Sequence, residues 1–182
     1  MRTLAIVCCA LLLAGCVSIS NPFVRMKPDY AAVPEEALRT AARAMEVAVQ
    51  EGRRDATIAD QDGLVVNTPE IMQAMRTRAA RYELLAAFMN TGHAWEQRSG
   101  LVSILRTKDY KKATTRQQRD RHALSVMSEN TDRWIIYEGL LEANNLPPRA
   151  LSAVQAIFFE ARRDVLRTGW KYEDEHGNPA TK

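Results

Sequence analysis

Residues 115–148 read TRQQRDRHALSVMSENTDRWIIYEGLLEANNLPP, and this stretch decides the predicted fold. Thr115 and Gln118 have the spacing of a capping box, in which each side chain satisfies a backbone N–H at a helix start. The Asn-Asn-Leu-Pro-Pro run at the other end is a helix stop, because proline cannot continue a helix. Between these signals one face of a long helix carries Ala123, Met127, Asn130, Trp134, Tyr137 and Leu141.

Similar signals predict three more helices. Pro34 begins a helix that we expect to run to about Gly52. Thr68 and Pro69 begin a second one as N-cap and first residue. Its apolar stripe is Met72, Met75, Ala79, Tyr82, Ala86 and Met89. The last helix follows the double proline and carries Leu151, Val154, Phe158, Ala161 and Val165.

No segment shows sustained alternation of apolar and polar residues, so we predict no sheet. The predicted fold class is all-α, a small bundle of about four helices over residues 34–171. Residues 93–113 fit a short helix and loops. The polar residues 172–182 fit a disordered tail.

The N-terminus has the pattern of an export signal. Arg2 precedes an apolar run, Leu4 to Leu13, which is too short to span a bilayer as a helix. The run closes on Leu13, Ala14, Gly15 and Cys16, and this ending resembles the lipobox of bacterial lipoprotein precursors. The resemblance implies a signal peptide over residues 1–15 and lipid, such as palmitate, on Cys16. An ordinary secretory signal, or a buried strand that contains a cysteine, is the alternative.

Cleavage before Cys16 would remove Cys8 and Cys9, so the mature chain could form no internal disulfide. Residues 16–33 have no apolar period and fit the lipidated cysteine and a flexible tether. Val17 stands where Asp commonly favours the inner membrane in Gram-negative sorting. We therefore expect a lipid-anchored protein of the cell envelope, on the outer membrane facing the periplasm in preference to the inner membrane.

The second half of the chain resembles a known family. Asn130, Arg133 and Tyr137, followed by Leu140, Glu142 and the Asn-Asn-Leu-Pro turn, are similar to the centre of the YdbL-like domain of unknown function. Arg98, Gly100 and Val102 match its upstream segment, although a second glycine expected near Ser103 is missing. The resemblance covers about residues 96–170. It implies a small exported envelope protein with an accessory or assembly role beside proteins thought to carry lipids between membranes, and it supplies no catalytic residues.

Two sets of residues are candidates for binding. Asn130, Arg133 and Tyr137 share one helix face and, with Asn144, Asn145 and Pro147, form a candidate interaction face. The alternative, which we favour, is that they make internal hydrogen bonds and packing contacts. Lys108, Lys111, Lys112, Arg116 and Arg119 form a candidate patch for an anionic lipid surface. A solvated helix start is the alternative reading of that charge.

Nothing in the sequence has the form of a catalytic site. His93, His122 and His176 are far apart and have no spaced ligand partner of the zinc-site kind. We therefore predict no enzyme activity, no metal and no cofactor, and the expected compartment disfavours nucleic acid as a partner. The predicted function is a non-catalytic adaptor or accessory factor that binds an envelope protein, with lipid transport or outer-membrane maintenance as its candidate roles. The alternative is a lipid or small-ligand binder with a cavity between the second and last helices. Partner identity and oligomeric state stay open.

Overall fold

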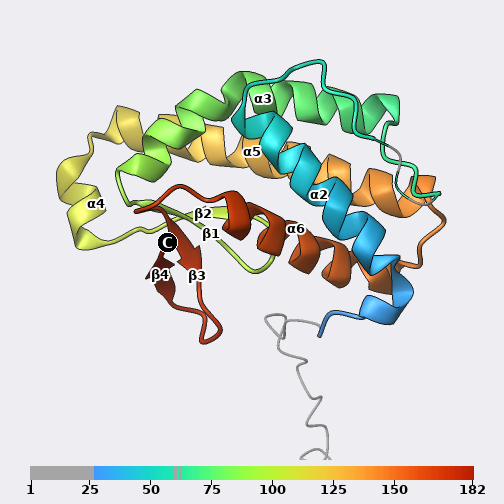
Figure 1. Cartoon of the computed structure of the whole chain (residues 1–182). Helices are drawn as coiled ribbons and strands as arrows, with labels where there is room; N and C mark the ends of the chain where they lie inside the picture. The colour runs from blue at the N-terminus through green and yellow to red at the C-terminus, as the bar shows by residue number, and fades with distance from the viewer. Residues whose placement is uncertain (1–26, 60, 62) are drawn as a thin grey trace, which may run out of the picture.

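The computed structural model describes residues 27–59, 61 and 63–182. Four long helices form its body: α2 (Glu35–Gln50), α3 (Pro69–Asn90), α5 (Arg116–Ala143) and α6 (Leu151–Val165). Figure 1 shows α3 lying along α5, with α2 and α6 packed against each other beside them. The predicted positions of these four helices are confirmed. Three shorter helices complete the set: η1 (Tyr30–Ala32), α4 (Lys108–Ala113) and η2 (Pro148–Ala150).

Local capping explains where α3 and α5 begin. The Thr68 hydroxyl accepts a hydrogen bond from the backbone nitrogen of Ile71. At α5 both halves of the capping box form: the Thr115 backbone nitrogen donates to the Gln118 side chain, and the Gln118 nitrogen donates to the Thr115 hydroxyl. These bonds satisfy N–H groups that have no partner inside the helix.

The prediction of an all-α fold is wrong, because the protein contains a four-stranded mixed sheet. Its strands are β1 (Ala94–Glu96), β2 (Val102–Ile104), β3 (Lys171–Glu173) and β4 (Pro179–Thr181), in the order β2-β1-β3-β4. β1 pairs antiparallel with β2 and parallel with β3, and β3 pairs antiparallel with β4. Residues 172–182, predicted to be a disordered tail, supply most of β3 and all of β4. Residues 93–113 form β1, β2 and α4.

The length and pairing of the strands explain why the sequence does not predict them. Each has only three residues, which is too short for a two-residue alternation to stand out from chance. The parallel pair also joins Trp95 to Lys171, and no local signal reports a partner so distant in sequence.

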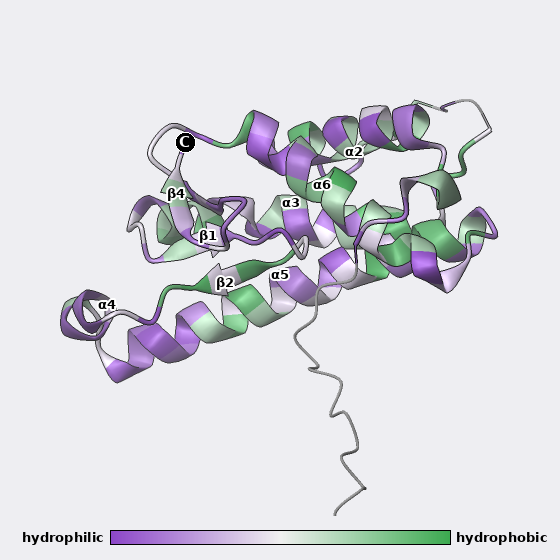
Figure 2. Ribbon diagram, turned by 90° about the horizontal axis from the view of Figure 1, so that it is seen from below, coloured by the Kyte–Doolittle hydropathy of each residue, from purple (hydrophilic) through white to green (hydrophobic). Residues whose placement is uncertain are grey.

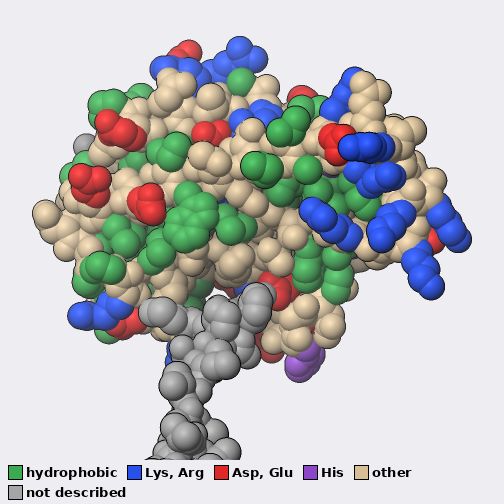
Figure 3. Space-filling model, turned by 180° about the vertical axis from the view of Figure 1, so that it is seen from behind, with side chains coloured by type: hydrophobic (Ala, Val, Ile, Leu, Met, Phe, Trp, Pro, Cys, Tyr) green, Lys and Arg blue, Asp and Glu red, His purple; other side chains and the backbone are tan. Residues whose placement is uncertain are grey.

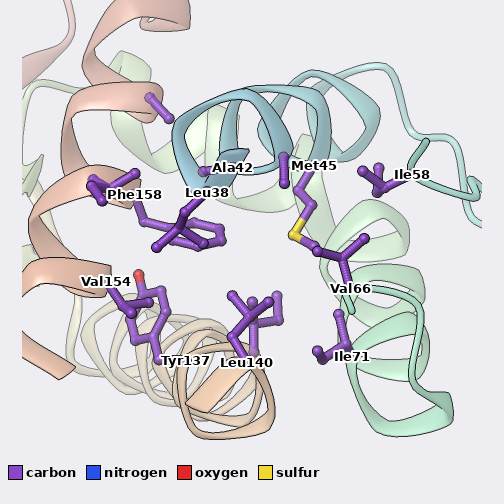
Figure 4. Packing of buried hydrophobic residues seen from close by; sticks show 14 of the residues in the cluster. Leu38, Ala42, Met45, Ile58, Val66, Ile71, Tyr137, Leu140, Val154 and Phe158 are labelled. Carbon is purple, nitrogen blue, oxygen red and sulfur yellow. The ribbon is translucent and has the colours of Figure 1, made fainter. Parts of the chain in front are cut away.

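The apolar core has two clusters. One joins α2, α3, α5 and α6, and Figure 4 shows Leu38, Met45, Tyr137, Leu140 and Phe158 meeting there. The second lies nearer the sheet and contains Tyr82, Leu85, Phe88, Met89, Ala94, Val102 and Trp170. The predicted stripe of α3 is buried from Met75 to Met89, and Met72 is half-buried.

The predicted stripe of α5 is displaced. Met127, expected to face inward, is 64% exposed. The residues of α5 that are buried are Val126, Glu129, Arg133, Ile136, Tyr137 and Leu140. The helix is therefore turned so that Glu129 and Arg133 face the core. A pattern of apolar residues does not predict the burial of charged side chains.

The described chain begins against the domain. η1 lies beside η2, and Asp29 pairs with Arg149 at 3.1 Å. Residues 27–33 of the expected tether are therefore packed, and the rest of the tether lies outside the described residues. None of the helices that the structure describes is long and apolar enough to cross a membrane.

Candidate functional site

A closed ring of charged side chains lies at the centre of the molecule. We call it the arginine–glutamate ring, and its members in spatial order are Glu46, Arg78, Glu129, Arg133, Glu96 and Arg162. Each member is at most 3% exposed. They come from α2, α3, α5, β1 and α6, so the ring joins every long helix to the sheet. Three positive and three negative groups alternate, which makes the ring neutral.

Arg78 forms the first part of the ring. Its two terminal nitrogens bind both carboxylate oxygens of Glu46, at 3.1 and 2.8 Å. Its Nε donates to Oε1 of Glu129 at 2.9 Å. The other carboxylate oxygen of Glu129 accepts from Arg81, which in turn binds Asp132 at 2.6 Å. The guanidinium of Arg78 therefore joins α3 to both α2 and α5, with the two-pronged geometry that only arginine provides.

Arg133 and Arg162 close the ring. Arg133 donates through Nε to Glu129 at 2.8 Å and through both terminal nitrogens to Glu96, at 2.6 and 2.8 Å. Arg162 donates through Nε to Glu96 at 3.0 Å and through Nη1 to Glu46 at 2.9 Å. Each carboxylate thus faces at least two guanidinium groups.

The carbonyl of Gly100 completes the polar interior. It accepts from Tyr137 Oη at 2.6 Å, from Arg162 Nη2 at 2.8 Å and from Arg133 Nη1 at 3.3 Å. Gly100 has φ +77°, and a Cβ there would lie 2.9 Å from the Tyr137 oxygen and 3.2 Å from the Gln155 carbonyl. The β1–β2 turn can enter the ring only because this residue is glycine.

The arginines of the ring favour the charged forms of Glu46 and Glu129. Burial alone would raise the pKa of Glu129 and of Glu46, but the neighbouring arginines outweigh it and hold both values below the ordinary 4.5. Burial would lower the pKa of Arg133, but Glu96 and Glu129 raise it well above its ordinary value. A general base at neutral pH needs a carboxylate pKa raised toward 7. The pKa values of Glu46 and Glu129 are shifted in the opposite direction, so these two carboxylates are suited to ion pairing and not to proton transfer.

The space beside the ring is small. The cavity there, between α3 and α6, has a volume of about 20 Å³ and is lined by ring members together with Tyr82 and Trp170. That volume holds about one water molecule. The alternative prediction was a ligand-binding cavity between these two helices. The arginine side chains fill that region.

The candidate interaction face points inward. Arg133 and Tyr137 are 1% and 0% exposed, and both bind inside the ring region. Asn130 is half-buried, and its side chain accepts from the nitrogen and donates to the carbonyl of Val102, both at 2.9 Å. Asn130, Arg133 and Tyr137 therefore make internal hydrogen bonds, which is the alternative that we favoured from the sequence.

The other three residues of that face shape the turn after α5. Asn144 binds both backbone polar groups of Val65, at 2.7 and 2.8 Å, and so holds the 53–67 loop against the end of α5. Asn145 adopts φ 51°, the left-handed conformation that asparagine tolerates. Pro147 is the residue before η2. All three therefore set the path of the chain.

The predicted basic residues lie together at one end of the molecule. Lys108, Lys111 and Lys112 are exposed on α4, and Arg116 is exposed in the first turn of α5. Arg119 is half-buried, and its Nη1 donates to the carbonyls of Thr114 and Lys111. Figure 3 shows Lys and Arg side chains gathered at the end that carries α4, and Figure 2 shows α4 and the adjoining part of α5 mostly hydrophilic.

A surface groove of about 470 Å³ lies along α6, which supplies half of its lining residues. Its other walls are Lys27, Pro28 and Tyr30 at the start of the described chain, Arg98 and Ser99 of the β1–β2 turn, and Pro148 of η2. Apolar contributors are Tyr30, Pro148, Leu151, Ala156 and Phe159, and the charged ones are Lys27, Arg98 and Glu160. This volume is in the range of small-ligand and peptide side-chain pockets. No local sequence pattern predicts this groove, because its walls come from four separate segments.

The histidines take part in packing. The ring of His122 stacks on Phe88 at 3.9 Å, and its Nδ1 lies 3.2 Å from the Tyr110 hydroxyl. Burial, followed by the charge of His93, lowers the pKa of His122. Within the described part of the chain, no three His, Cys, Asp or Glu residues are grouped to hold a metal ion. Cys16 and the signal residues Leu13, Ala14 and Gly15 lie outside the described residues.

The chain matches no protein-family model, no curated protein and no solved structure. The YdbL-like resemblance therefore stays a prediction from its residues.

Proposed function

We propose that this protein is a lipid-anchored, non-catalytic adaptor of the bacterial cell envelope, which binds a segment of an envelope protein in the groove beside η1. The groove is the observation that carries the proposal. The two apolar clusters and the arginine–glutamate ring fill the interior of the domain, which supports a binding site on the surface.

The groove fits a peptide segment with an apolar side chain and a carboxylate. Tyr30, which is 39% exposed, and the half-buried Leu151 supply apolar surface. The guanidinium of Arg98 lies over the ring of Phe159, 5.9 Å from its centre, and among the described residues its guanidinium forms no ion pair. Lys27 supplies a second cation at the wall, while Glu160 is engaged by Arg163 at 2.5 Å. The open charge of the groove is therefore positive and complements an acidic residue.

The position of the groove agrees with a tethered role. Lys27 lies eleven residues after Cys16, a distance of at most about 36–40 Å in an extended chain. A lipid on Cys16 would therefore hold the groove close to the membrane and limit its search to envelope proteins. We propose the outer membrane, on its periplasmic side, as the more favoured location because Val17 follows the cysteine.

Site-specific photo-crosslinking in intact cells tests the proposal. A photoreactive amino acid replaces Gln155 in the groove and, as a matched control, the exposed Thr40 on α2. We expect one envelope protein to crosslink from position 155 and not from position 40, through a peptide that contains Asp or Glu next to apolar residues. The Arg98→Glu variant should reduce this product at least about tenfold, because it puts a negative charge beside the carboxylate. Equal products from both positions, or no product from position 155, would overturn the proposal.

A further inference from the structure

Positive charge is concentrated in one short part of the chain. Residues 106–121 contain two acidic residues, Asp109 and Asp120, and seven basic ones, Arg106, Lys108, Lys111, Lys112, Arg116, Arg119 and Arg121. This segment has a net charge of +5, whereas the whole chain has +3, so all other residues together are net negative. Among the described residues, none of these seven cations forms an ion pair, although many other arginines do. The charge is available to an external anion.

The fold holds these cations in place. The Thr107 side chain caps the start of α4. Tyr110, 3% exposed, anchors α4 through its hydroxyl contact with His122 and its ring contact with Phe88. Arg119 binds the carbonyls at the end of α4 and so connects it to α5. The lysines therefore lie on a fixed surface.

An exposed apolar patch adjoins this basic end. Leu84 on α3 is 59% exposed, and Leu124 and Met127 on α5 are each 64% exposed. A shallow groove of about 440 Å³ runs between the two helices here, and Arg121 and Gln118 contribute to it beside Leu84 and Leu124. Exposed leucine and methionine beside lysine and arginine is the combination by which peripheral proteins contact a membrane surface.

We propose that the end formed by α4, the first half of α5 and Leu84 docks on an anionic phospholipid bilayer. Its cations would lie at the lipid phosphates, and Leu84, Leu124 and Met127 would enter the headgroup region. Because the rest of the chain is net negative, the same lipid charge repels it, which gives the docked domain one orientation. The inference rests on the proposed envelope location and is independent of the groove that we propose for a protein partner.

A fluorescence-quenching measurement on the full-length purified protein tests the inference. A genetically encoded fluorescent amino acid replaces Gln117 at the basic end of α5 or, as a control, Glu142 at the other end of the same helix, about 37 Å away. The protein is mixed with vesicles of phosphatidylcholine alone or with 30% phosphatidylglycerol, each with a quencher on the headgroup of a tracer lipid. We expect the ratio of quenching at position 117 to quenching at position 142 to rise at least about threefold with phosphatidylglycerol. It should return to its starting value in 0.5 M salt, because salt screens exposed charges.

Two matched double variants test whether the rise depends on this surface or only on the total charge of the protein. Lys111→Ala with Lys112→Ala should abolish most of the rise. Arg53→Ala with Arg54→Ala, which removes the same charge from a loop elsewhere, should leave the rise unchanged. A quenching ratio that does not change with phosphatidylglycerol, or an equal effect of the two double variants, would overturn the inference. A failed crosslinking experiment together with this rise would contradict the protein-binding groove alone.

Discussion

The side chain of Asn130 pairs with the backbone of Val102 as a neighbouring strand would: Oδ1 accepts from the nitrogen and Nδ2 donates to the carbonyl oxygen, both at 2.9 Å. β2 is one of the two edge strands of the sheet, so these are backbone groups that a foreign strand would otherwise find free. An asparagine on α5 therefore protects the sheet edge.

Replacing Asn130 by alanine should expose that edge. We expect the free energy of unfolding to fall by about 1–3 kcal/mol, since two backbone groups lose their partner. We also expect concentration-dependent light scattering to increase. Asn144→Ala is the matched control, because it removes the same two kinds of hydrogen bond from Val65, which lies outside the sheet. Equal scattering from the two variants would contradict a protective role for Asn130.

Neutralising one ring carboxylate should strongly destabilise the protein. In Glu129→Gln the shape is kept, but Arg78 and Arg133 lose a shared counter-ion inside the core. We expect chemical denaturation to show a loss of about 3–5 kcal/mol. Asp164→Asn removes one partner of the exposed pair with Arg43 and should change stability by less than about 1 kcal/mol. If both variants lose similar amounts, the ring is not a stabilising unit.

Acid should unfold the protein through the same carboxylates. The pKa values of Glu46 and Glu129 lie below 4.5 in the folded protein because the ring arginines favour their charged forms. The unfolded chain therefore binds protons more readily as the pH falls below about 4.5, and the stability that these groups provide above that pH is progressively lost. We expect the free energy of unfolding, measured by urea denaturation, to decrease steeply below this pH. A profile that stays flat down to pH 3 would refute the assigned charge states.

Gly100 should not tolerate a side chain. Gly100→Ala combines a positive φ with contacts of 2.9 Å to the Tyr137 oxygen and 3.2 Å to the Gln155 carbonyl. We expect a loss of about 1–2 kcal/mol from the backbone conformation and about 1–3 kcal/mol more from overpacking. Gly169 has φ +89° but nothing within 4 Å of the added carbon, so Gly169→Ala should show the first effect alone. Thermal denaturation of the two variants measures the difference, and equal melting temperatures would disprove the steric role.

Lipid attachment is tested by metabolic labelling. Cells grown with radioactive palmitate should label the protein, and Cys16→Ser should abolish both the label and membrane retention during fractionation. Cys9→Ser should retain both, since this cysteine lies within the predicted signal peptide. Labelling that survives Cys16→Ser would place the lipid elsewhere.

The helices could be predicted from the sequence because their signals are local. Thr115 and Gln118 lie three residues apart, and the double proline ends the same helix within the quoted stretch. The sheet could not be predicted in this way. Trp95 and Lys171 are separated in sequence by α4, α5 and α6, and each of the strands has three residues.

The ring is the clearest feature that pattern analysis missed. Sequence interpretation places charged residues outside, yet Arg78 follows Met75 by three residues and precedes Tyr82 by four, so it stands in the apolar stripe of α3. The position of Arg78 within this stripe is a sequence signal that this one ring member is buried. Glu129 and Arg133 are also one turn apart, but their burial follows only once Glu96 and Arg162 are known to lie opposite.

The ring also determines when the domain can fold during synthesis. Its members enter the chain between residues 46 and 162, and Arg162 comes last. A nascent chain that stops before Arg162 has three ring carboxylates and only two ring guanidiniums, and burying the surplus negative charge is unfavourable. Such a chain also lacks β3 and β4, so β1 has no parallel partner. Completion of the native core is therefore postponed until almost the whole polypeptide has been made, which leaves the growing chain open for as long as synthesis continues.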